Sequence, residues 1–481
     1  MKRTYKIDYS ESIDNFKKIE NIPSDLIYGD PEKIRNPFIS YVIPVYKRAH
    51  LLEKTIMSIL NQKPVDFEWD IVIVDNEAGG ENETERLIRR MASDRVLYYR
   101  NRENVGPAGN YNKCIELASG EWIAMLHGDD LIMNDHLKCS YEYIRYCQGE
   151  KVAPAYISQR YIDFSDEDKE VYLDRDSCTN TNVAINIRHV YANGKPQRQT
   201  QKYGILTGYF AALPSFGTLM NREIMLAEGG FTEEFGVCED VITPFKLADK
   251  YGVYMTPVVM GYHRFDGNES MKTETTMEIY ESMLDFREYM YSTVWWGKMW
   301  KYLSKDIFSE NLRNYCIGQS RFGSKRLKDE DFDYIYKVKK LSFFQKAAFN
   351  LVNKFIDMKY NFEGFDGMIS MMLDGKSESI QKIIDDKRKV VLYGAGDAGK
   401  SVCSLLKKKY PKVKIEGFAV TDLSAERELC GYKVRKIDEY AAMRDDVTVI
   451  TTTVTWQFQD EMNATLERLN FESVINLRGI D

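Results

Sequence analysis

Two adjacent carboxylates, Asp129 and Asp130, follow the apolar run 122–126. Carboxylates this close repel each other unless a cation joins them, and hard oxygen ligands suit Mg²⁺ or Mn²⁺, which keep positions for water and phosphate oxygens. A second acidic pair, Glu239 and Asp240, is by itself most simply interpreted as an exposed acidic helix start. These residue types indicate metal-assisted chemistry on a phosphate-bearing substrate.

Polar residues also follow other apolar runs. The runs 38–43, 71–74 and 96–99 predict buried strands, and Pro44, Tyr46 and Asp75 come directly after the first two. In open α/β sheets, ligands bind beyond the carboxyl ends of the strands. Tyr46 can therefore stack on a base, and Asp75 can accept hydrogen bonds from a base or a ribose.

The elements that position these residues alternate between strand and helix. Apolar residues recur at helical spacing between the strand-like runs, which is typical of a parallel sheet covered on both faces. Residues 1–37 are predicted to be a lead-in segment, with order beginning at Phe38. Residues 160–204 are polar and irregular and are interpreted as a substrate loop or lid. The first domain is expected to span residues 38–275.

Several segments, in this order along the chain, resemble the motifs of family 2 glycosyltransferases with the GT-A fold. They are 40–46, 71–76, 103–106 with Asn110 and Asn112, 120–130, 217–220, 229–231 and the pair Glu239–Asp240. The resemblance covers about residues 38–270. It implies an α/β domain with a mixed, mostly parallel sheet and inverting transfer of a sugar from a nucleotide diphosphate donor to an acceptor hydroxyl.

The resemblance also implies a role for each matching residue. Asp240 would be the catalytic base and Glu239 would orient the acceptor, while Asp129, together with His263, would hold Mn²⁺ or Mg²⁺. His127 and Gly128 stand where the family has an acid, so His127 could contact the nucleotide or simply pack. The expected donor-binding residues are Pro44, Tyr46, Asp75, Asn104, Gly106, Asn110, His127, Asp130 and Arg264.

Composition narrows the classes of partner. A net charge of -7 and a pI of about 5.6 argue against a nucleic-acid binder. The N-terminus lacks a signal-like apolar run, and the eight cysteines are scattered singly. We therefore expect a cytoplasmic protein, or one peripheral to the inner face of a membrane, that acts on a glycan or lipid-linked acceptor. By analogy with the family, bacterial surface glycan or polysaccharide assembly is the expected setting.

Residues 276–387 are predicted to form a helical connector. Its apolar residues Phe343, Phe344, Ala347, Leu351 and Phe355, with lysines nearby, could form a helix face that lies on a membrane or packs on the protein itself. Trp295 and Trp296 are expected in the core.

Residues 388–481 are predicted to form a small Rossmann-like unit with four strands. Gly394, Gly396 and Gly399, with Asp422 further on, match a dinucleotide-binding turn, and the same stretch also fits a P-loop pattern. A structural or regulatory role for this unit stays open, as does pairing with a second copy. Two alternatives to the transferase remain: a non-catalytic nucleotide-sugar-binding protein, and an NAD-linked sugar-modifying enzyme that uses this unit.

Overall fold

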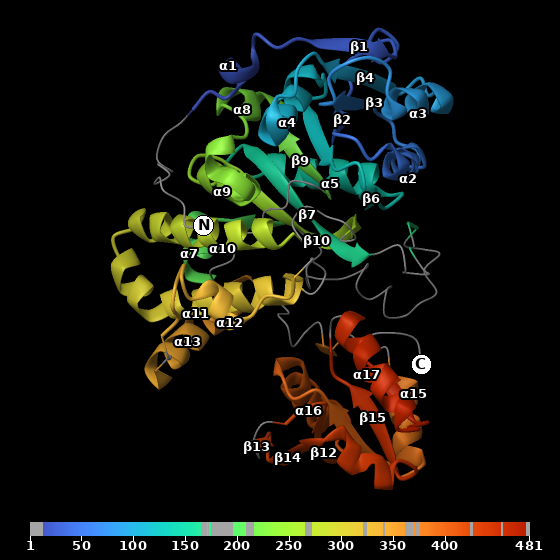
Figure 1. Cartoon of the computed structure of the whole chain (residues 1–481), viewed down its shortest axis with the longest axis vertical. Helices are drawn as coiled ribbons and strands as arrows, with labels where there is room; N and C mark the ends of the chain where they lie inside the picture. The colour runs from blue at the N-terminus through green and yellow to red at the C-terminus, as the bar shows by residue number, and fades with distance from the viewer. Residues whose placement is uncertain are drawn as a thin grey trace. The chain divides into compact units, whose positions relative to one another are not determined.

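The computed structural model describes residues 13–164, 171, 173–174, 196–207, 216–264, 272–320, 325–339, 342–360, 369–370, 373, 376–423, 427–453 and 456–477. The described residues up to Tyr360 form one compact unit, and those from residue 369 onward form a second. Each unit has a mixed or mostly parallel sheet with helices around it, so the predicted α/β fold class is confirmed (Figure 1).

The first unit is built on a ten-stranded sheet with the order β1-β4-β3-β2-β5-β9-β7-β10-β6, and β8 pairs with β10. Its central strands β2, β3, β4 and β5 are parallel neighbours, and the strands from β9 onward add antiparallel pairs. The strand bounds are β1 Ser24–Tyr28, β2 Ile39–Val45, β3 Trp69–Asp75, β4 Val96–Asn101, β5 Trp122–Leu126, β6 Leu131–Ile132, β7 Pro154–Phe164, β8 Gln197–Gln199, β9 Phe216–Asn221 and β10 Gly252–Arg264.

The central strands bury both faces, as their continuous apolar sequence predicted. Alternate residues of β3 point to opposite cores, with Val72 and Val74 on one side and Ile71 and Ile73 on the other. Helices α2 (Ala49–Leu60), α3 (Glu83–Met91) and α5 (His136–Gln148) cover the second side, whereas α4 (Gly106–Leu117) covers the first.

The chain reverses its direction of travel across the sheet between β2 and β5. It leaves β2 toward β3 and β4 through helices on one face, then returns through α4 on the other face to β5, which lies on the far side of β2. The register aligns Val45 with Asp75 and Asp75 with Arg100, so the carboxyl ends lie at one edge. Such a switch point opens a crevice at that edge.

The N-terminal segment corrects one prediction. Ser24–Tyr28 pairs antiparallel with β4, and the Ser24 hydroxyl donates to Asn101 Oδ1 at 2.7 Å. The short helix α1 (Phe16–Ile19) precedes it. The prediction that order begins at Phe38 is therefore wrong, because backbone pairing along an edge strand tolerates the polar, proline-bounded sequence.

The segment 160–204 is also more regular than expected where the structure describes it. β7 runs to Phe164 in parallel with β10, and β8 together with α7 (Gln201–Thr207) follows the part of this segment that lies outside the described residues. The strands in this segment pair with β10 through backbone hydrogen bonds, which the polar side chains of the sequence do not indicate. The proposed lid therefore falls mainly on residues that the structure does not describe.

A helical layer completes the first unit on the α4 side of the sheet (Figure 1). It consists of α8 (Arg222–Ala227), η1 (Glu233–Cys238), α9 (Glu239–Leu247), α10 (Thr273–Ser292), α11 (Gly297–Gln319), α12 (Asp329–Phe332) and α13 (Phe343–Tyr360). Trp300 is buried, but Trp295 is 93% exposed, so the prediction that Trp295 belongs to the core is wrong. Within the described part of the chain, no helix has the length and hydrophobicity needed to span a bilayer.

The second unit has a six-stranded sheet, not the four strands predicted, in the order β13-β14-β12-β11-β15-β16. The extra strands are the short β13 and β16, which only tertiary pairing reveals. The bounds are β11 Lys389–Tyr393, β12 Lys414–Val420, β13 Arg427–Leu429, β14 Tyr432–Lys436, β15 Val447–Thr451 and β16 Val474–Asn476, with α15 Ser377–Asp385, α16 Asp397–Lys409, η4 Ile437–Met443 and α17 Trp456–Arg468 around them.

Candidate active site

A pocket of about 420 Å³ lies at the switch point of the first unit. One wall is the segment 44–48, which follows β2, and the facing wall is the turn 127–129, which follows β5. Asn76 and the start of α4 close the third side. The predicted donor residues Pro44, Tyr46, Asn104, Asn110 and His127 therefore meet in one cavity, because each follows a strand that ends at the same edge.

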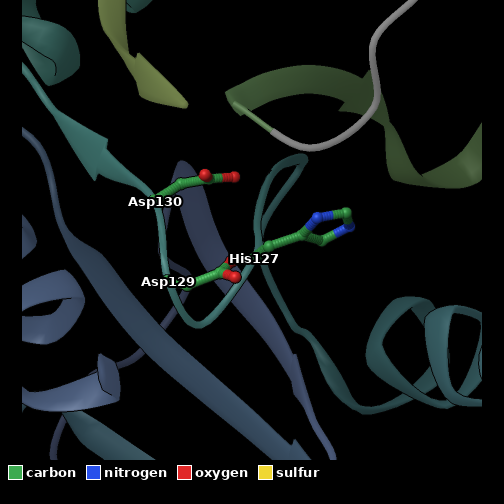
Figure 2. A group of neighbouring side chains, drawn as sticks. All are labelled: His127, Asp129 and Asp130. Atoms are coloured by element: carbon green, nitrogen blue, oxygen red, sulfur yellow. The ribbon is translucent and has the colours of Figure 1, made fainter. Parts of the chain in front are cut away.

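The turn after β5 gathers the possible metal ligands. His127, Asp129 and Asp130 each offer a ligand atom, and these atoms lie within 4.8 Å of one another. Figure 2 shows all three side chains leaving this one turn. The Asp129 carboxylate lines the pocket. Its hard oxygen donors fit Mg²⁺ or Mn²⁺, so the residues present suit the ion that the sequence predicted.

Asp130 and Arg264 are less available than predicted. Asp130 is 1% exposed, and its Oδ1 accepts a hydrogen bond from the Arg264 backbone N–H at 3.0 Å. Arg264 is itself buried, with its guanidinium over the Phe164 ring and Nε donating to the Asp129 carbonyl at 3.3 Å. Arg264 thus links the end of β10 to the turn after β5 that carries Asp129 and Asp130.

Tyr111 was missed by the sequence analysis. It lies on α4 and stacks on His127, with ring centroids 5.8 Å apart and an interplanar angle of 16°. The Tyr111 hydroxyl is 3.0 Å from His127 Nε2. Burial lowers the pKa of His127 to about 4, and burial followed by the charges of Glu239 and Asp240 holds the pKa of Tyr111 well above its usual range. Burial therefore disfavours the charged form of both rings.

Lys47 and Arg48 were missed as well. Both residues have left-handed backbones, with φ of 63° and 59°, which is uncommon for residues other than glycine and costs of the order of 1 kcal/mol each. Both line the pocket, and Arg48 Nη1 lies 3.5 Å from Asp129 Oδ2. Adjacent cationic residues directly after a strand that ends in the pocket were the available sequence signal.

Asparagines form a network beneath the pocket. Asn76 Nδ2 donates to Asn104 Oδ1 at 2.9 Å, and Asn101 Nδ2 donates to Asn76 Oδ1 and to Asn110 Oδ1. The Gly106 N–H donates to Asn104 Oδ1, and the φ of Gly106 is +74°. Asn110 is 3% exposed. These predicted donor residues therefore hold the β4–α4 loop against β3.

Asp75 does not line the pocket. The side chain is fully buried and accepts hydrogen bonds from the Glu77 N–H, Asn82 Nδ2 and the Tyr98 hydroxyl at 2.7–2.9 Å. Asn82 also caps helix α3, because its Oδ1 accepts from the Glu85 N–H. Asp75 thus organises the turn after β3 and is not among the residues that line the cavity.

The acidic pair Glu239–Asp240 forms the first turn of α9. Burial raises the pKa of Asp240 to about 7 and, with the added repulsion of Asp240, the pKa of Glu239 to about 8. Glu239 Oε2 is buried without a hydrogen-bond partner among the described residues. Both charges act on Tyr111, as does that of Asp129, so Tyr111 lies within electrostatic reach of both acidic pairs.

The segment before the acidic pair is pinned to α4. Asn112 Oδ1 accepts from the Phe231 N–H and Asn112 Nδ2 donates to the Phe231 carbonyl, both at 2.8 Å. A Cβ on Gly230, whose φ is +69°, would lie 2.3 Å from Asn112 Oδ1. This close approach fixes where α9 begins relative to the pocket.

Residues 40–203 match the family model of glycosyl transferase family 2. This segment holds the pocket walls and the carboxylate turn. The matched segment is about a third of the chain.

Curated relatives are similar over shorter stretches of the chain. The chain is 34% identical over 104 residues to a GalNAc(5)-diNAcBac-PP-undecaprenol beta-1,3-glucosyltransferase of Campylobacter jejuni, covering 21% of this chain and 32% of that protein. It is 32% identical over 107 residues to the abequosyltransferase RfbV of Salmonella typhimurium, covering 22% and 32%. The chain thus spans about a third of the length of these relatives.

Solved structures were compared as well. The structure of residues 1–349 of S. aureus TarS in complex with UDP is similar with a TM-score of 0.40 and 13% identity, covering 82% of this chain and 95% of that one.

Two further predicted groups are not among the residues that line the pocket. His263, next to Arg264, packs edge-to-face on Tyr161 and is not in the group of ligand atoms around Asp129. In the second unit, Gly394 and Gly396 lie in the turn between β11 and α16, Gly399 lies in the first turn of α16, and Asp422 is exposed after β12. A Cβ on Gly399 would lie 2.1 Å from the Gly394 carbonyl oxygen. Binding of a nucleotide at this turn stays a prediction.

Proposed function

We propose that this chain is a metal-dependent, inverting glycosyltransferase that moves a sugar from a nucleotide diphosphate donor to an acceptor hydroxyl. The observation that carries the proposal is that Asp129 lines a pocket at the switch point of the sheet, while the charges of the second acidic pair act on Tyr111, which lines the same pocket. Burial raises the pKa of Asp240, a member of that second pair, to about 7. The match to the family 2 model supports the same reaction class.

The donor would enter with its base at the mouth of the pocket. Tyr46 is 52% exposed there and can stack on a base. The diphosphate would then lie near Lys47, Arg48 and Asp129. A bound Mn²⁺ or Mg²⁺ would neutralise the charge that grows on the leaving diphosphate. Asp129 would hold that ion, and Arg264 keeps the turn of Asp129 in place through its backbone contacts.

Asp240 would remove the proton from the acceptor hydroxyl. A general base works best when its pKa lies near the operating pH, and burial brings Asp240 there. With a pKa of about 8, Glu239 is mainly protonated at pH 7 and can donate a hydrogen bond to the acceptor. Attack from the side opposite the leaving diphosphate inverts the anomeric carbon.

The acceptor would be a glycan or a lipid-linked glycan, in the assembly of surface glycans. The names of the relatives support this acceptor class, because one relative is named as a glucosyltransferase of an undecaprenol-linked sugar chain. A setting at the inner face of the membrane follows from such an acceptor.

We also propose contact with an anionic membrane surface through an aromatic face on the helical layer. This face consists of the exposed residues Trp295, Met299, Tyr302, Phe343, Phe344 and Leu351. Its two halves adjoin, because Gln345 Nε2 donates to the Tyr302 carbonyl at 3.1 Å. Lys298, Lys301 and Lys346 lie between these residues in sequence, and such a pattern of aromatic and basic side chains suits a headgroup layer.

The test of the transferase proposal is release of nucleoside diphosphate from a panel of nucleotide sugars, with and without Mn²⁺. We expect one donor to be hydrolysed slowly, only with the metal, and Asp129→Ala and Asp240→Asn to lose this activity. Asp66→Asn is the control, because Asp66 is exposed and far in sequence from both acidic pairs. Metal-independent release, or full activity of Asp240→Asn, would contradict the proposal.

A further inference from the structure

Two cysteines that the sequence does not place near each other meet in the second unit. Cys403 is buried on α16, and Cys430 is exposed in the turn between β13 and β14. Lys407, one helical turn after Cys403 on the same face of α16, donates from Nζ to the Cys430 carbonyl at 3.3 Å. The two thiols lie within hydrogen-bonding reach of each other. The fold therefore places a pair of free thiols side by side.

The hairpin of β13 and β14 packs on α16 around this pair. Lys407 Nζ lies 4.5 Å from the centre of the Tyr432 ring. Leu429 and Tyr432, which flank the turn, pack against the core cluster that contains Cys403. β14 is also paired in parallel with β12, the next strand of the sheet. Cys430 is therefore held at α16 by the residues on both sides of its turn.

The backbone of this turn is unusual for a cysteine. Cys430 and Gly431 have φ of 53° and 83°, and the pairing of Leu429 with Tyr432 leaves only these two residues in the turn. Two-residue turns with two left-handed positions favour Asn-Gly or Asp-Gly, because most other L residues rarely adopt this backbone. The shape of the turn therefore does not account for a cysteine at this position, whereas a use of its thiol does.

We propose that Cys403 and Cys430 form a reversible disulfide, which ties the hairpin at the edge of the second sheet to α16. The Cys430 thiolate attacks a low-molecular-weight disulfide such as oxidised glutathione, forms a mixed disulfide and releases one glutathione thiolate. The Cys403 thiolate then attacks the Cys430 sulfur, forms the intramolecular bond and releases the second glutathione. The protein thiols lose two electrons, and the small disulfide is reduced to two thiols that take up the two protons.

The surroundings of the two thiols set the order of attack. Cys430 is exposed and can meet a small disulfide in solution, whereas Cys403 is buried. Burial raises the pKa of the Cys403 thiol to about 11, and the neighbouring Cys430 adds to this rise while the charge of Lys407 opposes it. Cys403 is therefore a poor first nucleophile, but the mixed disulfide on Cys430 brings an electrophilic sulfur within its reach.

Mass spectrometry of the full chain tests the disulfide directly. The chain is incubated with oxidised glutathione, its remaining thiols are alkylated, and it is digested without reductant. We expect a pair of peptides joined through Cys403 and Cys430, which dithiothreitol separates. The oxidised chain should carry two fewer alkylated thiols than the reduced chain, because each disulfide consumes two thiols.

Two variants separate the roles of the two thiols. In Cys403→Ser, Cys430 should keep one glutathione as a mixed disulfide, because no second thiol displaces it. In Cys430→Asn, which suits the left-handed turn, Cys403 should stay reduced. Cys139→Ser, at a partly exposed cysteine on α5 of the first unit, is the matched control and should give the same joined peptides as the wild type.

Three results would overturn the inference. The first is a wild-type chain in which Cys430 keeps its glutathione and no joined peptides form. The second is a Cys430 that does not react with oxidised glutathione, and the third is a main product in which Cys430 is joined to a cysteine other than Cys403. Each of these is read from the same digest, and none depends on transferase activity.

Discussion

Arg48 Nη1 lies 3.5 Å from Asp129 Oδ2, so a cationic side chain shares the carboxylate expected to hold the metal. The Arg48 side chain is 44% exposed, whereas the Asp129 side chain is 15% exposed. The pair is therefore partly screened by water, and each partner can exchange for another ion.

This pairing predicts that Arg48 competes with a divalent ion for Asp129. We expect Arg48→Gln to tighten binding of Mn²⁺ about threefold, since exposed pairs contribute about 0.2–1 kcal/mol, and to weaken binding of a nucleoside diphosphate. Mn²⁺ titration followed by electron paramagnetic resonance measures the first effect. Lys54→Gln, which removes an exposed cation on α2, the helix that follows Arg48, should change neither. Unchanged Mn²⁺ affinity in Arg48→Gln would rule out the competition.

The acidic pair predicts a pH dependence of the reaction. Since burial raises the pKa of Asp240 from 3.8 to about 7, and the base must be unprotonated, kcat/KM at saturating Mn²⁺ should rise with pH through about pH 7. Asp240→Asn should lower kcat about 10³-fold at every pH, within the usual range for removal of a general base. A profile that is flat between pH 6 and pH 8 would exclude Asp240 as the base.

The same ionisation affects stability in a defined direction. The folded protein keeps the Asp240 proton to a higher pH than the unfolded chain does, so stability should fall as the pH rises from about 4 to about 7. Asp240→Asn removes this loss and should be more stable than the wild type at pH 8, by on the order of 4 kcal/mol. Urea unfolding of the two proteins at pH 5 and pH 8 measures the difference, which should be smaller at pH 5.

Gly217 allows a prediction about β9. Its φ is +70°, and a Cβ there would lie 2.4 Å from Nε2 of the buried His136. His136 is already bonded to the Tyr41 hydroxyl at 2.6 Å and cannot easily move. We expect Gly217→Ala to destabilise the first unit by about 3 kcal/mol, from strain and displacement together.

At Gly318, replacement of glycine by alanine is expected to stabilise the protein, unlike the same replacement at Gly217. Gly318 lies within helix α11, and nothing lies within 4 Å of a Cβ built on it. Gly318→Ala should therefore stabilise the protein by about 0.5–1 kcal/mol, because alanine favours the helix. Thermal unfolding of both variants tests the pair, and equal effects would show that the Gly217 backbone is not constrained.

The aromatic face predicts binding to membranes. Vesicles with a large share of anionic lipid should bind the protein, and the double variant Trp295→Ser with Phe343→Ser should bind at least tenfold more weakly, because two largely exposed aromatic rings no longer enter the interface. Tyr146→Ser is a control on α5, which covers the other side of the sheet. Equal binding of wild type and double variant in vesicle sedimentation would reject this surface.

The central strands of the first unit could be predicted from the sequence, because their burial depends on runs of neighbouring apolar residues. The strands 71–74, 96–99 and 122–126 are continuous apolar runs, and such runs are buried wherever the sheet is covered on both faces. Asp129 follows one of these runs directly, so its place at the edge of the sheet needed no tertiary information. By contrast, β1 and β7 are held in the sheet by backbone hydrogen bonds, and their side-chain types did not indicate these strands.

The sequence by itself thus determined the alternation of strand and helix, the strand ends and the order of the family 2 motifs, because these depend on neighbouring residues. Only the tertiary structure decided which strand-end residues face the cavity. The Asp75 carboxylate is buried and accepts hydrogen bonds from Tyr98 and Asn82, whereas the Arg48 guanidinium lies near the Asp129 carboxylate. It also decided the stacking of Tyr111 on His127, since α4 and β5 meet only when the chain crosses back over the sheet.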